Sequence, residues 1–305
     1  MVAPQYSSSS LGIMFLALFS LLLLSTTTTR AFVSPFSSSH AAAAAATSSH
    51  SSLPQLHMFT GIVEEMGVVE TLEERNDVKL WDGTIGTGTQ LTINCSTVLQ
   101  GAYVGCSICV SGVCLTATEL IDERAFVVGL APETLRKSNL GSLRQGDKVN
   151  LERAAAIMSE VVVVGGRGGG RNSGHFVQGH VDDTGTIAQT WVDGDSLFVQ
   201  IQVPTPSLLK YIVKKGFIAV DGTSLTVCEV FPETSEFTVM LVEYTQKKII
   251  LPEKQVGDEV NIEVDVLGKY AESALAGILP RMEALERKVK ELETELNQYK
   301  QSKNS

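Results

Sequence analysis

Cys114 is the residue of this chain best suited to covalent or proton-transfer chemistry. It lies in the block 111–116, whose pattern returns in the block 221–226 with Ser224 at the corresponding position. A thiolate acts as a nucleophile or a base when its pKa is lowered, whereas a buried cysteine is often an inert apolar side chain. The two blocks predict a reactive thiol in one copy of a repeat and a hydroxyl in the other, with a structural cysteine as the alternative.

His180 marks a second chemical difference between the two copies. The first copy has Ile62 where the second has His180, between a glycine and a valine in both cases. Imidazole transfers protons readily near neutral pH. The difference suggests that two pockets of common origin have specialised. An ordinary surface or core histidine is the alternative.

The elements that position these residues belong to a duplicated unit. Blocks of the chain recur in one order at offsets of 118, 110 and 111 residues, pairing 59–67 with 177–185, 111–116 with 221–226, and 146–152 with 257–263. Such internal similarity indicates repeated structural units. A protein with two copies of one binding fold can hold two copies of one ligand, which matters most when a reaction joins two identical molecules.

Each copy consists of short strand-like runs between glycine turns, which predicts an all-β fold of small closed barrels. Residues 61–63, 107–110 and 148–151 are examples of such runs, and short helices are expected from Pro132 and over 208–216. The glycine-rich segment between the copies lacks the GK[ST] ending of a phosphate loop. It is therefore interpreted as a flexible linker.

The C-terminal segment has a different pattern. Apolar residues alternate at spacings of four and three with charged residues between them, which predicts a coiled-coil helix. Self-association is favoured over docking on the barrels, and the pattern leaves the number of strands open. The seam comprises Ile278, Met282, Leu285, Val289, Leu292, Leu296 and Tyr299.

Composition limits the classes of partner. The chain has 305 residues, which suggests two domains, and a formal net charge of −10. An acidic body argues against nucleic acid and anionic membrane surfaces as partners. The five cysteines are odd in number and imply no disulfide framework. Cys106 and Cys109 form a single CxxC without the second pair of a zinc site, so no metal is expected.

The first 57 residues have the composition of a targeting segment. Leu11–Leu24 is an apolar run that fits the core of a signal peptide and is short for a membrane span. Residues 34–57 are rich in Ser and Ala and contain no acid, as in transit peptides. Together they resemble the bipartite plastid leaders of algae with complex plastids. This predicts a soluble plastid (chloroplast) protein without membrane association after cleavage. A secretory signal followed by a disordered stalk is the alternative.

The body resembles riboflavin synthase of the α-chain type over nearly all of residues 58–300. The resemblance implies two tandem six-stranded antiparallel β-barrels, a C-terminal α-helix and a homotrimer held by that helix. It also implies the dismutation of two 6,7-dimethyl-8-ribityllumazine molecules to riboflavin and 5-amino-6-ribitylaminouracil, with no cofactor. In the family, the first barrel of one subunit and the second barrel of a neighbour form the reaction site. The matching motifs are 58–64, 112–116, 133–135, 139–141, 174–182 and 215–227.

The resemblance assigns four of the five catalytic candidates, and the difference between the two repeats adds His180. Cys114 and His180 take part in nucleophilic attack and proton transfer, and Ser107 acts near C7 of a lumazine, with a plain strand serine as its alternative. Lys215 matches a ligand-contact position, where a cation can stabilise developing negative charge. Asp265 matches an acidic position of the family, with a solvated carboxylate at a strand end as its alternative.

The walls of the substrate pockets are expected from both repeats, where a few polar groups fix the orientation of a ligand. Thr116 and Thr226 offer hydroxyls at matching places. In the first repeat, the expected contacts are Gly61, Ile62, Val63, Cys114, Leu115, Thr116, Gly129, Leu130, Ala131, Pro132, Glu133 and Thr134. In the second, they are Gly179, His180, Val181, Lys215, Ser224, Leu225, Thr226, Met240, Leu241, Val242, Glu243, Tyr244 and Thr245.

The rival hypothesis is a non-catalytic lumazine- or flavin-binding protein with the same duplicated fold. Such relatives tend to lose the serine and cysteine positions that this chain keeps at 107 and 114. A coiled-coil scaffold with passive barrels is a third hypothesis. The predicted domains are a leader at 1–57, a barrel at 58–160, a linker at 161–174, a barrel at 175–270 and an oligomerisation helix at 271–305.

Overall fold

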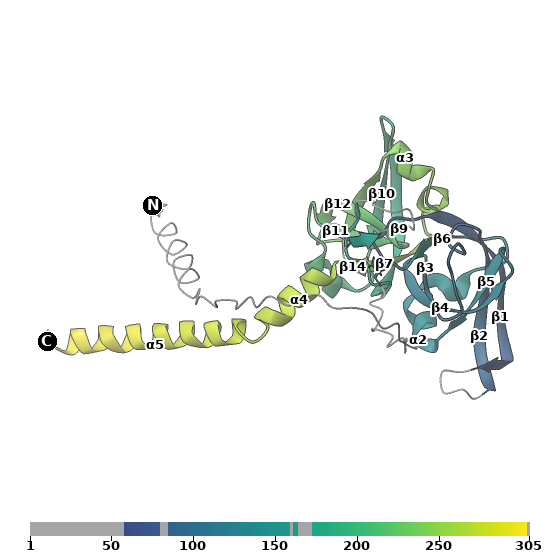
Figure 1. Cartoon of the computed structure of the whole chain (residues 1–305). Helices are drawn as coiled ribbons and strands as arrows, with labels where there is room; N and C mark the ends of the chain where they lie inside the picture. The colour runs from purple at the N-terminus through teal and green to yellow at the C-terminus, as the bar shows by residue number, and fades with distance from the viewer. Residues whose placement is uncertain (1–57, 80–84, 159–160, 164–172, 304–305) are drawn as a thin grey trace, which may run out of the picture. The chain divides into compact units, whose positions relative to one another are not determined.

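A computed structural model describes residues 58–79, 85–158, 161–163 and 173–303. They contain two closed six-stranded barrels with the same strand order (Figure 1). The first has the order β1-β2-β5-β4-β3-β6 and the second β9-β10-β13-β12-β11-β14, so each strand corresponds to one in the other barrel. Neighbouring strands are antiparallel throughout both barrels. The predicted duplicated barrels are confirmed.

The strands of the first barrel are β1 (Glu65–Lys79), β2 (Ile85–Asn94), β3 (Ser107–Val110), β4 (Val113–Ile121), β5 (Ala125–Leu130) and β6 (Lys148–Arg153). Those of the second are β9 (Asp183–Asp193), β10 (Ser196–Gln202), β11 (Phe217–Val220), β12 (Thr223–Phe231), β13 (Glu236–Leu241) and β14 (Glu259–Val264). The short helices are α2 (Pro132–Lys137), η1 (Asn139–Ser142), η3 (Pro206–Tyr211), α3 (Glu243–Gln246) and η4 (Leu251–Glu253).

Alternation along the strands builds the two cores. In β4, Val113, Leu115 and Ala117 point into the first barrel, while the residues between them face outward. A two-residue turn of Ser111 and Gly112 joins β3 to β4, with φ values of 42° and 87°. Both residues have positive φ, as in a type I′ hairpin turn, whose twist matches that of the strands. The β11–β12 hairpin repeats this geometry.

Three sequence-based boundaries were wrong. Residues 61–63 are not a strand, because β1 begins at Glu65. The expected linker begins with β8 (Val161–Val163), which pairs with β7 (Ala156–Met158), and residues 164–172 lie outside the described part of the chain. The expected helix over 208–216 is the shorter 3-10 helix η3. The leader at 1–57 also lies outside the described residues.

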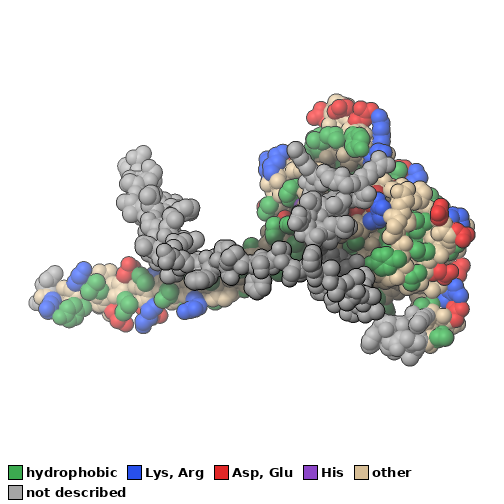
Figure 2. All heavy atoms as spheres, viewed as in Figure 1, with side chains coloured by type: hydrophobic (Ala, Val, Ile, Leu, Met, Phe, Trp, Pro, Cys, Tyr) green, Lys and Arg blue, Asp and Glu red, His purple; other side chains and the backbone are tan. Residues whose placement is uncertain are grey.

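Two helices follow the second barrel. α4 (Val266–Leu275) starts earlier than the predicted boundary at 271, because the Asp265 side chain accepts a hydrogen bond from the Leu267 amide and caps it. α5 (Leu279–Lys303) carries the apolar seam from Met282 onward, Ile278 lies just before the helix, and all seam side chains are exposed (Figure 2). No helix within the described ranges has the length and apolar character needed to cross a membrane.

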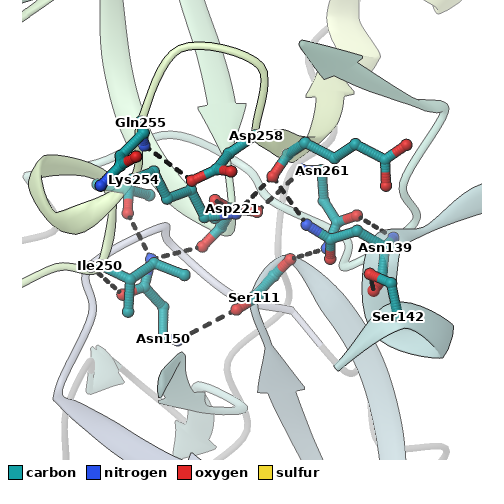
Figure 3. A network of polar contacts seen from close by, with 12 residues as sticks. Ser111, Asn139, Ser142, Asn150, Asp221, Ile250, Lys254, Gln255, Asp258 and Asn261 are labelled. Carbon is teal, nitrogen blue, oxygen red and sulfur yellow. Dashed lines mark hydrogen bonds and ion pairs between the residues drawn. The ribbon is translucent and has the colours of Figure 1, made fainter. Parts of the chain in front are cut away.

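A reciprocal hydrogen-bond network joins the two barrels (Figure 3). Asn150 at the end of the first barrel donates to the Asp221 carbonyl in the second at 2.8 Å. Asn261 in the second donates to the Ser111 carbonyl in the first, also at 2.8 Å. The second repeat adds an ion pair between Lys254 and the fully buried Asp221 at 3.0 Å. The network fixes the β3–β4 and β11–β12 turns against each other.

Candidate active site

The β3–β4 hairpin carries the first-repeat residues that we predicted to act in the reaction, on the side that faces away from the barrel core. Ser107 lies opposite Thr116 in the strand register, and the Ser107 hydroxyl hydrogen-bonds the Cys114 thiol. Burial raises the pKa of that thiol, and the hydrogen bond from Ser107 opposes the shift in part. The lowered pKa that would make Cys114 a ready thiolate is therefore absent in the single chain. Cys114 is a neutral thiol that can give up a proton.

His180 comes to this first-barrel face although it belongs to the second repeat. The Cys114 amide donates to the Gly179 carbonyl at 2.8 Å, and His180 follows directly and is exposed. The neighbouring Val181 packs against the core of the first barrel. We call residues 175–182, which lead into the second barrel, and residues 58–64, which lead into the first, the leading segments of the two repeats. The buried Glu263 holds the leading segment of the second repeat by accepting a hydrogen bond from the His180 amide at 2.8 Å. The histidine and the thiol thus share one face.

The leading segment of the first repeat makes the reverse contact. The Ser224 amide donates to the Gly61 carbonyl at 2.8 Å, and Val63 packs against the core of the second barrel. The buried Glu152 accepts the amides of Thr60 at 2.7 Å and Gly61 at 3.0 Å. Each leading segment therefore bridges the two barrels. The predicted wall residues 61–63, which we assigned to the first barrel, therefore lie against the second barrel, and residues 179–181 lie against the first.

His175 completes the second face. Its Nδ1 lies 2.7 Å from the Ser224 hydroxyl, and its ring stacks on Phe217 at 5.1 Å between centroids. Burial lowers the pKa of His175, while nearby Asp265 raises it in part. The imidazole is therefore neutral at neutral pH and can exchange a proton with Ser224. Neither His175 nor Phe217 is among the residues predicted from the sequence, although Phe217 stands where the first repeat has Ser107.

Lys215 is exposed in a turn before β11 and has a φ of 66°. The first repeat has Gly105 at the corresponding place, with a φ of 99°. Glycine adopts this region freely, whereas another residue there costs about 1–2 kcal/mol. A lysine in a conformation that favours glycine suggests that its side chain has a function, because glycine would form the same turn without this cost.

The remaining predicted wall residues fall into two groups. The first lies on open surface: Ile62, Thr116, Gly129, Ala131, Pro132, Glu133, Thr226, Val242, Glu243 and Tyr244 are exposed, and Thr134, Met240 and Thr245 are half-buried. The second group supports these faces from inside the barrels: Leu115, Leu130, Leu225 and Leu241 belong to the cores. A polar cavity of about 610 Å³ lies elsewhere, near Lys148 and Lys254, and none of the predicted residues line it.

The comparisons with known proteins agree with the duplicated-barrel fold. A family model described as the lumazine binding domain matches residues 60–154 and 178–265. Solved structures of LumP share the fold. The one complexed with 6,7-dimethyl-8-(1'-D-ribityl) lumazine has a TM-score of 0.54 and 20% identity, and it covers 68% of this chain and 99% of that one.

Curated riboflavin synthases are more similar in sequence. That of Meyerozyma guilliermondii is 46% identical over 220 residues, covering 72% of this chain and 86% of the relative. That of Schizosaccharomyces pombe is 45% identical, covering 70% and 92%. That of Bacillus subtilis is 39% identical, covering 70% and 87%. The chain, with its two lumazine-binding barrels, therefore belongs to the riboflavin synthase family.

Proposed function

We propose that this chain converts two molecules of 6,7-dimethyl-8-ribityllumazine into riboflavin and 5-amino-6-ribitylaminouracil, using two chemically different faces of a duplicated barrel. The observation that carries the proposal is the pairing of Cys114 with Ser107 on one face and of Ser224 with His175 on the other. The two barrels share one fold, which suits two copies of the same ligand, while the different side chains suit two different roles.

One lumazine must lose a proton from its 7-methyl group, and the other must be attacked at C7. A four-carbon unit then passes from the donor to the acceptor. On the first face, exposed His180 is the candidate base, and Ser107 and Cys114 relay protons or add to C7. On the second, Lys215 stabilises negative charge on the ring, and Asp265 holds the start of α4 beside His175. This assignment leaves open which face holds the donor.

The two faces act together only if two subunits meet. Each face has exposed residues around its half-buried centre, Thr116 and His180 on the first and Lys215 and Thr226 on the second. We propose that a partner subunit covers these residues and encloses the ligand. We propose that α5 brings three subunits together, because its seam is exposed along its full length, with Leu285 66% exposed. Holding two reactants in contact replaces a bimolecular encounter and supplies much of the rate. The first face of one subunit would then meet the second face of its neighbour.

The test is incubation of the purified chain with the lumazine alone. The proposal expects flavin absorbance to appear, with two lumazines consumed for each riboflavin formed. Binding without turnover would instead support the rival lumazine- or flavin-binding protein. Deletion of residues 279–305 should abolish turnover and leave lumazine binding by the first barrel, whereas the passive scaffold predicts only the loss of a partner. A confirmed monomer that turns over normally would refute the shared site.

The leader supports a proposal about location. Residues 1–57 combine an apolar core with an acid-free segment rich in Ser and Ala, and we propose that they deliver the protein to the plastid stroma. A fluorescent protein fused behind residues 1–57 should accumulate in the plastid of an alga with complex plastids. Secretion of the fusion would support the simple secretory signal instead.

A further inference from the structure

Cys109 and Cys114 lie directly opposite each other on β3 and β4. The two-residue turn makes Val110 and Val113 the hydrogen-bonded pair of this hairpin, so the next pair outward is not hydrogen-bonded. Consistently, the Cys114 amide donates to Gly179 and not across the hairpin. Cα atoms of such a pair are about 4.5 Å apart, within the range of about 4.4–6.8 Å that a disulfide spans.

Both thiols also lie on the same side of the hairpin. Cys109 is buried, at 2% exposed, in a cluster with Phe59, Val177 and Ala219, and the partly exposed Cys114 packs against that cluster. The other two cysteines of this repeat, Cys95 and Cys106, pack instead against the core of the first barrel.

The second repeat shows what the fold itself requires here. At the corresponding positions, Ala219 lies opposite Ser224 in the β11–β12 register. The same hairpin therefore forms and packs without sulfur at either place. The facing pair of thiols is a special property of the first repeat.

We propose that Cys109 and Cys114 form a reversible disulfide that turns off the first-repeat face. The expected loss of activity rests on the proposed function, in which Cys114 takes part in turnover. Formation of the disulfide does not depend on that function. A hydroperoxide oxidises the more accessible Cys114 to a sulfenic acid, with cleavage of the O–O bond and release of an alcohol or water. The Cys109 sulfur then attacks the Cys114 sulfur. The S–O bond breaks, and the hydroxyl leaves as water with the Cys109 proton.

Burial raises the pKa of both thiols, which lowers the thiolate fraction and slows oxidation, so the experiment needs an excess of oxidant. Disulfides across a strand pair are strained and are therefore easily reduced. Return to the dithiol by a small thiol reductant follows from the same geometry.

The experiment uses the purified full chain, reduced and then treated with hydrogen peroxide. Free thiols are blocked with iodoacetamide, the protein is reduced, and the thiols that reappear are labelled with N-ethylmaleimide and located by tandem mass spectrometry. The proposal expects the second label on Cys109 and Cys114. Flavin formation should fall by about a hundredfold, the effect of losing a proton-transfer group, and return after dithiothreitol.

Cys109→Ala copies the second repeat and is the decisive variant. It should keep the activity of the reduced protein. After prolonged peroxide it should lose activity irreversibly, because the Cys114 sulfenic acid has no facing thiol and oxidises further to a sulfinic acid that dithiothreitol does not reduce. Cys228→Ala, in the other barrel, should behave as the parent. Cys109→Ser serves if the alanine variant fails to fold by circular dichroism. Labels on Cys95 and Cys106, or reversible inactivation that persists in Cys109→Ala, would overturn the proposal. A chain that makes no flavin but labels Cys109 and Cys114 would sink the proposed function alone.

Discussion

Gly179→Ala tests the exchange of leading segments between the barrels. Gly179 has a φ of 78°, and a Cβ added there would lie 2.6 Å from the Cys114 Cβ and 2.7 Å from its backbone nitrogen. The left-handed conformation costs about 1–2 kcal/mol, the overlap about 1–3 and the displaced Cys114–Gly179 hydrogen bond about 1. The free energy of unfolding should therefore fall by about 3–6 kcal/mol. Gly61→Ala should cost about as much, because its Cβ would meet the Ser224 Cβ at 2.6 Å.

Gly101→Ala is the matched control for this prediction. Gly101 has a φ of 80°, and its added Cβ would meet nothing within 4 Å. This variant carries only the backbone cost of about 1–2 kcal/mol. Guanidinium unfolding followed by circular dichroism measures all three variants. Equal losses for Gly179→Ala and Gly101→Ala would refute the close contact between the leading segment and the β3–β4 hairpin.

Other predictions concern the buried acids that hold the leading segments and the junction. Burial raises the pKa of Glu152 from 4.5 to about 7. Between these two pH values the folded protein keeps the Glu152 proton that the unfolded chain loses. The free energy of unfolding should therefore fall by about 3 kcal/mol as the pH rises from 4.5 to about 7. In urea titrations at several pH values, Glu152→Gln should flatten this slope, and an unchanged slope would contradict the assignment. Lys254→Met removes the partner of buried Asp221 and should cost about 2–4 kcal/mol. Asp221→Ser with Lys254→Leu copies Ser111 and Leu143 of the first repeat and should recover most of that loss in thermal unfolding; a double variant no more stable than the single one would show that the pair is not interchangeable.

The strands followed from the sequence because alternation and glycine turns are local signals. Residues 107–110 became β3, and residues 148–151 lie within β6. The repeat blocks predicted a duplicated fold, and the two barrels have the same strand order. The short segment around Gly61 was wrongly predicted as a strand, because its backbone bonds to the Glu152 carboxylate and to Ser224 rather than to a neighbouring strand. The composition of this segment does not show whether its backbone bonds to such partners or to a neighbouring strand.

The sequence pointed to individual candidate residues of the site but not to their arrangement. Cys114 and Ser107 were recognised by motif, and the structure brings them into contact. The placement of His180 beside Cys114 depends on a crossing between segments far apart in sequence. The only local sign of that crossing is a glycine with positive φ at both 61 and 179. The neutral state of Cys114 comes from burial, which spacing alone does not reveal.

Subunit complementation tests the shared site most directly. Cys114→Ser damages the first face and Lys215→Ala the second, so each variant alone should be almost inactive. If the site joins the first barrel of one subunit to the second barrel of its neighbour, unfolding and refolding the two variants together rebuilds intact sites at about a quarter of the interfaces. Flavin formation should then rise well above that of either variant refolded alone. A mixture of confirmed heteromers no more active than its parents would contradict the account.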